Sequence, residues 1–510
     1  MNTLLSAALL VALLSHLMFF AIAKADWHDY YAIERVDYPI EIDPQVGGLT
    51  AMKDGRLALT VMHGDVVIYD PESETWDVFA SGLHMPLGIV EEKPGQFLVI
   101  QKPELTRLID TDSDGKADQY QTVYDDFGMT GNYHEFAFGP VVDTEGNIFI
   151  ALNVASNFNG VFEYIRGEYS DLCPPKDKMQ QWHDFEKWKQ GYRKKVTRMF
   201  SCAPYRGWVM KIAPDGEATP FASGFRSPAG MGFDDNGRLW VTDNQGDWIG
   251  TSPLHHVSEG DFAGHPASLH WKKGWQKPHS EIEASDLLPL RKPAAALFPH
   301  GELANSPTKP VKTIAKSLFG LPEGEMLLGD MNKNHLIRYL PDEIDGTLQG
   351  TLIPFVGGNA LGIGNYTMDF SSDGALWVGK VHMNWAGGEG LLKITKKKTP
   401  FLIESVTLHK DGFQITANEP IEALPDAVSI THHTYHYHAK YGSEKVGVTN
   451  VVPAKLTLDK SRKQLFITLD SLAENRLYTI DLGEMVSANG KPLMGTVLRY
   501  KLNKRAGDSQ

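Results

Sequence analysis

Residues 231–247 read "MGFDDNGRLWVTDNQGD" and contain two short apolar segments around an Asn-Gly pair. Asn-Gly readily adopts the positive backbone angles of a tight hairpin turn. Apolar and polar residues alternate after the turn, which is typical of a half-buried strand. The stretch therefore predicts a β-hairpin whose second strand ends in a run of polar residues.

The same pattern recurs along the chain, and helical periodicity is nearly absent. Copies lie at 49–70, 136–153 and 368–381, a weaker copy at 87–110 and a variant at 321–340. About six such units, spaced by roughly forty to fifty residues or more, are typical of a β-propeller. We therefore predict an all-β fold with a six-bladed propeller, seven blades being the alternative count and a β-sandwich array the alternative architecture.

The pattern changes after Lys396–Lys398 and Pro400, which resemble a linker. From Phe401 onward short alternating strands continue without the hairpin theme. We predict a propeller over 26–398 and a small Ig-like β-sandwich over 399–510. The linker also predicts that the sandwich has a core of its own and is dispensable for turnover.

The composition limits the partners and the compartment. A net charge of -14 argues against nucleic acid or an anionic membrane as a partner. Residues 1–25 form an apolar run ending in "AKA", which predicts a signal peptide cleaved after Ala25. An uncleaved anchor is the alternative reading. We expect a periplasmic or secreted mature protein without a membrane span.

Cys173 and Cys202 are the two cysteines of the chain. In an exported protein such a pair predicts one disulfide, which here would close an irregular polar insertion. Two unpaired thiols are the alternative. The chain has no C-x-x-C-H motif, so it does not attach a c-type haem covalently.

Two polar residues stand just before predicted innermost strands. His134 lies in "TGNYHEFAFGP", 130–140, and Arg226 lies in "FRSPAGMG", 225–232. In a propeller these positions meet at the mouth of a shared funnel. A histidine there is suited to accept a proton, and a guanidinium binds a carboxylate or polarises a carbonyl. A hydrogen-bonded rim histidine is the plainer alternative.

Three further stretches are candidate metal sites. "TDNQGDW", 242–248, offers the oxygens that a hard cation prefers, with an Asx-type turn as the alternative. Asp110, Asp112, Asp114 and Asp118 fit a calcium loop whose twelfth position is Gln121 instead of glutamate, so a solvated acidic hairpin competes. In "THHTYHYHAKYGS", 431–443, a copper or zinc site competes with an exposed aromatic strand.

Several of these motifs together carry a family resemblance. "NYHEFAFGP", "FRSPAGMGFDDNGRLWVTDNQGDW" and "NYTMDFSSDGALWVG" resemble the soluble glucose/sorbosone dehydrogenase superfamily of quinoproteins. "TRLIDTDSDGKAD", "GHPASL" and "YHAKYGS" are similar to a branch common in planctomycete-type bacteria, often labelled membrane-bound dehydrogenase. The resemblance runs over about residues 45–502. Longer relatives carry a c-type haem domain, which this chain lacks.

The resemblance implies a funnel that holds pyrroloquinoline quinone (PQQ) beside calcium. His134 aligns with the base that takes the sugar hydroxyl proton, and Arg226 with an arginine beside the quinone. Gln245, Gly246 and Asp247 align with the loop whose backbone oxygens bind the calcium, and Asp247 stands where a proline is usual. The resemblance also implies that Asn244 and Gln245 contact the cofactor. The strand "GIGNYTMDF", 362–370, lacks the usual cofactor-binding arginines, so Lys309 or Lys333 is expected to replace them.

Three functions remain open from the sequence. The first is a quinone-dependent dehydrogenase of an aldose, polyol or related carbohydrate, passing electrons to an external cytochrome c or quinone. The second is a noncatalytic propeller that binds glycans or proteins. The third is a polysaccharide lyase in which His134 and Arg226 act on a uronate with Tyr133 or Tyr366 as the acid.

Overall fold

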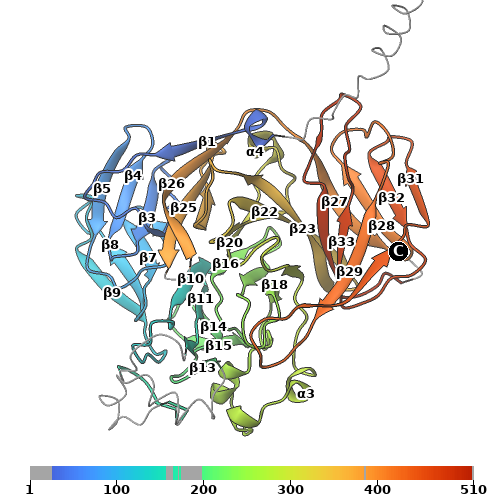
Figure 1. Ribbon diagram of the computed structural model, residues 1–510. Helices are drawn as coiled ribbons and strands as arrows, with labels where there is room; N and C mark the ends of the chain where they lie inside the picture. Colours follow the sequence, from blue (N-terminus) through green and yellow to red (C-terminus); the bar gives the residue numbers. More distant parts are fainter. Residues whose placement is uncertain (1–25, 157–164, 171, 174–197, 384–385, 508–510) are drawn as a thin grey trace, which may run out of the picture.

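The computed structural model describes residues 26–156, 165–170, 172–173, 198–383 and 386–507. Six antiparallel sheets stand around one axis, and a β-sandwich follows them (Figure 1). The predicted six-bladed propeller is confirmed. The residues assigned to the signal peptide, 1–25, lie outside the described residues.

Each blade has four strands, ordered from the axis outward. Blade 1 is β2 (Val46–Ala51), β3 (Leu57–Val61), β4 (Val66–Asp70) and β5 (Thr75–Ala80). Blade 2 is β6 (Gly88–Lys93), β7 (Gln96–Ile100), β8 (Leu105–Ile109) and β9 (Gln119–Tyr124). Blade 3 is β10 (Ala137–Val142), β11 (Ile148–Leu152), β14 (Trp208–Ile212) and β15 (Ala218–Ser223).

The second half of the ring repeats this order. Blade 4 is β16 (Gly230–Phe233), β17 (Leu239–Thr242), β18 (Ser252–Val257) and β19 (Ala296–Phe298). Blade 5 is β20 (Pro307–Lys312), β21 (Met326–Asp330), β22 (His335–Ile344) and β23 (Thr347–Gly357). Blade 6 is β24 (Asn365–Phe370), β25 (Leu376–Met383), β26 (Ala386–Lys396) and β1 (Tyr31–Val36).

The N-terminal strand closes the ring. β1 pairs antiparallel with β26, from Tyr31 opposite Lys396 to Val36 opposite Leu391. The first strand of the described chain thus becomes the outermost strand of the last blade. β1 is therefore the fourth strand of blade 6, and its pairing with β26 ties the two ends of the propeller together.

The innermost strands are packed closely on the axis, and glycine permits the approach. A Cβ placed on Gly88 would lie 1.5 Å from the Gly139 carbonyl oxygen, and one on Gly230 would lie 2.3 Å from the Lys309 nitrogen. The cavity left between these strands measures about 30 Å³. That volume is about one water molecule, so this part of the axis is a packed core and not a channel.

The remaining strands form a sandwich of two sheets. One sheet holds β27 (Phe401–His409), β28 (Gly412–Ala417), β31 (Lys455–Leu458), β32 (Gln464–Thr468) and β34 (Leu493–Met494). The other holds β29 (Ser429–Tyr435), β30 (Lys445–Val451), β33 (Arg476–Asp481) and β35 (Val497–Leu502). Short elements outside the blades are β12 (Ala155–Ser156), β13 (Met199–Phe200), η1 (Trp27–Asp29), η3 (Pro266–Trp271), η4 (His279–Glu281), α3 (Ala284–Leu287) and α4 (Lys316–Phe319).

The core of the sandwich is continuous with blade 5, and its dispensability for turnover stays a prediction. β35 pairs with β23 of blade 5, and the two sheets become one sheet of eight strands. Leu340, Ile344 and Ile353 of blade 5 pack in the same buried cluster as Ile415 and Tyr500 of the sandwich. The cause is the length of β22 and β23, which have 10 and 11 residues and extend beyond the blade.

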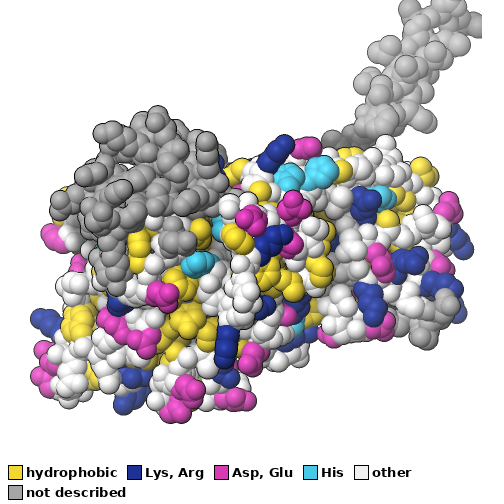
Figure 2. Space-filling model, turned by 90° about the horizontal axis from the view of Figure 1, so that it is seen from below, with side chains coloured by type: hydrophobic (Ala, Val, Ile, Leu, Met, Phe, Trp, Pro, Cys, Tyr) yellow, Lys and Arg dark blue, Asp and Glu magenta, His cyan; other side chains and the backbone are white. Residues whose placement is uncertain are grey.

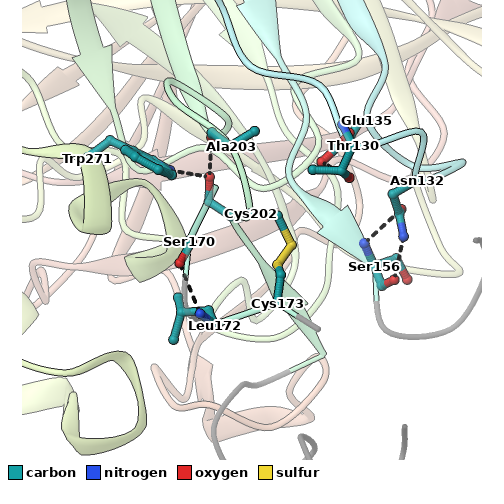
Figure 3. The surroundings of a disulfide bond; sticks show 11 residues. Thr130, Asn132, Glu135, Ser156, Ser170, Leu172, Cys173, Cys202, Ala203 and Trp271 are labelled. Carbon is teal, nitrogen blue, oxygen red and sulfur yellow. Dashed lines mark hydrogen bonds between the residues drawn. A yellow bond between two sulfur atoms is a disulfide. The ribbon is translucent and has the colours of Figure 1, made fainter. Parts of the chain in front are cut away.

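The disulfide between Cys173 and Cys202 is present and confirms the predicted pairing (Figure 3). Both cysteines are buried and pack with Leu172 and Phe200. The bond ties the start of the insertion to the segment just after β13. Within the described ranges, no helix is both long enough and apolar enough to cross a membrane.

We expect the double substitution of Cys173 and Cys202 by serine to lower the free energy of unfolding by about 3–4 kcal/mol, because the crosslink closes a loop with a sequence separation of 29. Urea unfolding of both proteins measures the difference. Two titratable thiols in the unfolded, unreduced wild type would contradict the pairing.

We expect a chain truncated after Lys398 to be poorly soluble or strongly destabilised. Removal of the sandwich exposes Leu340, Ile344 and Ile353 and leaves β23 as an uncovered edge. Expression yield and thermal unfolding measure the effect. A truncated chain that melts at the temperature of the full chain would contradict the shared core.

Candidate functional site

Buried carboxylates hold the loops that lead into the innermost strands of blades 4 and 5. Asp243 follows β17 and accepts hydrogen bonds from the backbone N–H of Arg226 at 2.8 Å and of Ser227 at 2.6 Å. Asp330 ends β21 and accepts the N–H of Asn305 at 2.8 Å and of Ser306 at 2.7 Å. The same arrangement recurs in both blades, and in blade 4 it fixes the backbone at Arg226 just before β16.

Arg226 is a buried cation with one anchored edge. Its side chain is 7% exposed, and Nε donates to Asp247 Oδ1 at 3.1 Å. Within the described part of the chain, its two terminal nitrogens have no hydrogen bond. The Tyr441 ring lies 5.5 Å from the guanidinium carbon. The unbonded edge can therefore donate to a carboxylate or another anionic oxygen of a ligand.

Asp247 balances this cation. Its side chain is 1% exposed, and Oδ2 accepts the N–H of Met199 at 3.0 Å and lies 3.5 Å from His265 Nε2. Burial raises the pKa of Asp247, but His265 and Arg226 outweigh burial and hold that pKa well below its usual range. His265 Nδ1 accepts the N–H of Ala267, which leaves the proton on Nε2 facing the carboxylate.

His134 lies beside Arg226, and its role as a base stays a prediction. Its Nδ1 is 3.1 Å from the Val154 carbonyl oxygen, and the Val154 N–H donates to the Arg226 carbonyl at 3.4 Å. Burial, and then the charge of Arg226, lower the pKa of His134 to about 3. The ring is therefore neutral near pH 7. With Nδ1–H donating to Val154, the lone pair of the ring is on Nε2.

The loop that carries His134 is held by residues outside the sequence prediction. Glu135 accepts the backbone N–H of Thr130 at 2.8 Å and its hydroxyl at 2.9 Å, while Asn132 bonds Ser156 (Figure 3). The buried Arg206 donates to the carbonyls of Glu135 and Phe136 at 3.0 and 3.1 Å. This network fixes the backbone on both sides of His134.

Lys102 adds a second cation to the site. Its Nζ donates to the Tyr133 carbonyl at 3.2 Å and lies 5.8 Å from the centre of the Phe136 ring. Burial is the main cause that lowers the pKa of Lys102 to about 8. Lys102 lies within the weaker hairpin copy at 87–110, just after β7, but the sequence analysis did not single it out as a site residue.

The predicted calcium position does not fit a cation. The Gly246 carbonyl accepts the N–H of Gly442 at 2.9 Å and of Ile249 at 3.2 Å, so both lone pairs are used. Asp247 is engaged by Arg226 and Met199. Calcium coordination by Gly246 and Asp247 would therefore require the loop around Gly442 to move away.

The predicted cofactor residues are spread around the site. Gln245 Nε2 donates to the Gly250 carbonyl at 3.1 Å, and Asn244 Oδ1 is buried without a hydrogen-bond partner among the described residues. Lys309 lies on β20 and lines the water-sized cavity on the axis. Lys333 Nζ bonds the Gly301 carbonyl. Cofactor binding by these four residues stays a prediction, and Asn244 has the best placed unused acceptor.

The acidic hairpin is at the outer edge of blade 2, between β8 and β9. Asp110, Asp112 and Asp118 each bring one carboxylate oxygen within 4.8 Å of the others. Asp114 is outside this group and accepts the Lys116 N–H at 2.8 Å. Asp110 itself accepts two backbone N–H groups of the turn. A calcium ion here stays a prediction, with three carboxylates in place of the four predicted.

The histidine-rich segment connects the sandwich to the candidate site. The His436 and His438 rings are 5.8 Å apart, and no group of three potential metal ligands among the described residues includes them. Instead, the loop 436–443 bonds blade 4 through its backbone. Trp248 N–H donates to His438 at 3.0 Å, and Ser443 N–H donates to Gly250 at 2.9 Å.

This loop also contributes to the site a tyrosine that the sequence analysis did not predict as a site residue. Tyr441, which is 50% exposed, pairs in a β-bridge with Asp247 and faces both Arg226 and Arg198. Figure 1 shows the connection after β29 reaching the end of the propeller where α3 lies. Seen from that end, Lys and Arg side chains are interspersed with Asp and Glu, and histidines reach the surface (Figure 2).

Comparison with known proteins gives distant likenesses. The family described as "Domain of unknown function (DUF7133)" matches residues 30–180. No curated protein matches the chain. The PQQ-bound aldose sugar dehydrogenase from Streptomyces coelicolor is 14% identical, with a TM-score of 0.44, and the likeness covers 72% of this chain and 98% of that one.

Two further solved structures are similar over the same share of the chain. The apo-form of a soluble aldose sugar dehydrogenase from Escherichia coli is 12% identical, with a TM-score of 0.46, over 72% of this chain and 100% of that one. A luciferin-regenerating enzyme is 11% identical, with a TM-score of 0.41, over 72% and 97%.

We expect the stability of the protein to fall as the pH drops below about 6.5. Burial is the main cause that lowers the pKa of His134 and of His255 to about 3. Between about pH 3 and the ordinary pKa of 6.5, both imidazoles bind a proton in the unfolded chain but not in the folded chain. Acid therefore favours unfolding.

Thermal unfolding between pH 7 and pH 4 measures this effect. The substitution His255→Gln removes one such proton and should make the decline shallower. The same substitution at the exposed His28 is the control and should leave the slope unchanged. Equal slopes in both variants and the wild type would contradict a neutral, buried His255.

Proposed function

We propose that the protein is an exported enzyme that oxidises a hydroxyl group of a carbohydrate at the site formed by His134 and Arg226. The observation that carries this proposal is a neutral imidazole with a fixed tautomer beside a guanidinium whose outer edge is unbonded. Nε2 of His134 accepts the proton of the hydroxyl group while the hydrogen on the carbon that carries this group is removed. The disulfide agrees with an oxidising compartment outside the cytoplasm.

The residues fit an anionic organic cofactor in part. The terminal nitrogens of Arg226 suit a carboxylate of PQQ, and Asn244 Oδ1 is an acceptor without a partner among the described residues. When bound, such a quinone supplies the hydride acceptor, and an external cytochrome c or quinone then takes the electrons. No calcium is assigned beside it, because the Gly246 carbonyl is already occupied.

The low pKa of His134 also limits the chemistry. A weakly basic imidazole accepts a proton only as the reaction develops, and it does not hold one in the resting protein. The positive charge of Arg226 disfavours a protonated His134, whereas Asp247 favours it. The Arg226–Asp247 ion pair therefore sets beside His134 one charge that lowers its pKa and one charge that raises it.

A lyase acting on uronate is the second candidate, and Tyr441 favours it. A uronate carboxylate on Arg226 would bring the adjacent carbon–hydrogen bond toward His134, with Tyr441 as the proton donor. Of the two tyrosines predicted from the sequence, Tyr366 is 3% exposed, and burial raises its pKa well above its ordinary value. Tyr441 is thus better placed than Tyr366 to act as the acid.

We expect His134→Gln to reduce dye reduction by the PQQ-reconstituted protein on aldoses and polyols by about two to four orders of magnitude. Glutamine keeps a hydrogen bond to Val154 but removes the base, so the melting temperature should change little. The control is His84→Gln, which makes the same exchange in the loop before β6 of blade 2.

The outcomes separate the candidate functions. Dye reduction that needs PQQ and His134 supports the dehydrogenase. An unsaturated product from polyuronates without PQQ, lost in both His134→Gln and Tyr441→Phe, supports the lyase instead. Glycan binding without turnover on either substrate class would leave a binding protein and refute both enzymes.

A further inference from the structure

A second cavity lies between blade 4 and the sheet that joins blade 5 to the sandwich. It measures about 390 Å³ and is lined on the propeller side by Arg291, Leu297 and Ala294, and on the other side by Tyr435, Tyr437 and Lys501. Natural sites for small molecules have volumes of roughly 300–1,000 Å³. The cavity is therefore large enough for a metabolite, and neither His134 nor Arg226 lines it.

Arg291 contributes an unpaired cation to this cavity. It follows α3, and its guanidinium carbon lies 4.5 Å from the centre of the Tyr437 ring. Within the described part of the chain its side chain makes no hydrogen bond or ion pair, and Nε is buried without a partner. The Tyr437 hydroxyl donates to the Gly264 carbonyl, so the ring is fixed in place.

Lys501 contributes a second basic group from the opposite wall. The residue lies on β35 and is 6% exposed, and among the described residues its Nζ donates a long hydrogen bond of 3.5 Å to the Leu502 carbonyl. Burial, followed by the charges of Arg291 and Arg476, lowers the pKa of Lys501 to about 7. No carboxylate among the described residues forms an ion pair with it.

Buried Lys501 and the partly buried Arg291, whose Nε is buried, face this cavity without a counter-charge among the described residues, and unpaired basic groups of this kind destabilise a fold. A polar surface lysine would instead extend into water or pair with an acid, as Lys504 does with Asp345 at 3.0 Å. The Glu302 carboxylate already forms an ion pair with Lys445. An anion in the cavity would relieve the repulsion and supply acceptors for Arg291 and Lys501 together.

We propose that this cavity, which we name the blade 4 pocket, binds a small organic anion whose carboxylate or phosphate group contacts Arg291 and Lys501. The body of the ligand lies against Tyr435, Tyr437 and Leu297. The aromatic rings and aliphatic side chains suit a ligand with a partly apolar or sugar-like body. This site is separate from the proposed oxidation site and does not depend on it.

The test is thermal unfolding of the full chain with inorganic phosphate or D-gluconate, compared with chloride at matched ionic strength. A ligand that binds the folded protein raises the melting temperature in a saturable manner. We expect this for at least one of the two anions. A response to phosphate alone identifies a phosphoryl group as the ligand, and a response to gluconate identifies a carboxylate.

The substitution Lys501→Met should weaken the apparent affinity by about ten- to a hundredfold, because a charged hydrogen bond is lost. Without ligand the variant should be at least as stable as the wild type, since it removes a buried unpaired charge. Lys504→Met is the matched control and should bind as the wild type does. Arg291→Met tests the pocket from the propeller side and should show the same loss.

Two results would overturn the proposal. One is the absence of any shift beyond that of chloride with both anions. The other is an equal, saturable shift in the wild type, Lys501→Met and Arg291→Met, which would place the anion elsewhere.

Discussion

The candidate site depends on one buried carboxylate, that of Asp243. Its two oxygens accept the backbone N–H groups of Arg226, Ser227 and Asn244 at 2.6–2.8 Å. A carboxylate at 0% exposure is costly unless its acceptors are used, and here they are used. The same bonds join the end of β17 to the loop before β16, so the hairpin and the loop position each other.

The bonded loop then reaches the neighbouring blade. Asn153 Nδ2 donates to the Ser227 hydroxyl at 3.0 Å, and Val154 bonds both Arg226 and His134 through its backbone. Blades 3 and 4 therefore present His134 and Arg226 as one unit. Within blade 2, Gln101 has the role that Asp243 has in blade 4, since its amide oxygen accepts the His84 N–H at 2.7 Å in the loop before β6.

The sequence alone was sufficient to predict the structural features that repeat along the chain. Asp-Gly and Asn-Gly turns marked the blades, and the convergence of loops before the innermost strands brought His134 near Arg226. The shared core with the sandwich was not predictable in this way, since the extension of β22 and β23 changes no local pattern. Arg206, His265 and Tyr441 lie in segments outside the repeat, where hydrophobic periodicity carries no information about neighbours in space.

The loop 436–443 shows why the sandwich and the propeller act as one structure. Its glycine, Gly442, bonds the Gly246 carbonyl, a position where the resemblance implied a metal. A chain whose backbone N–H satisfies that carbonyl has no need of a cation there, and Asp247 can instead balance Arg226. The sandwich loop and the Arg226–Asp247 ion pair are thus two parts of one arrangement beside His134, in which the Gly246 carbonyl is bonded by backbone and Asp247 by side chain.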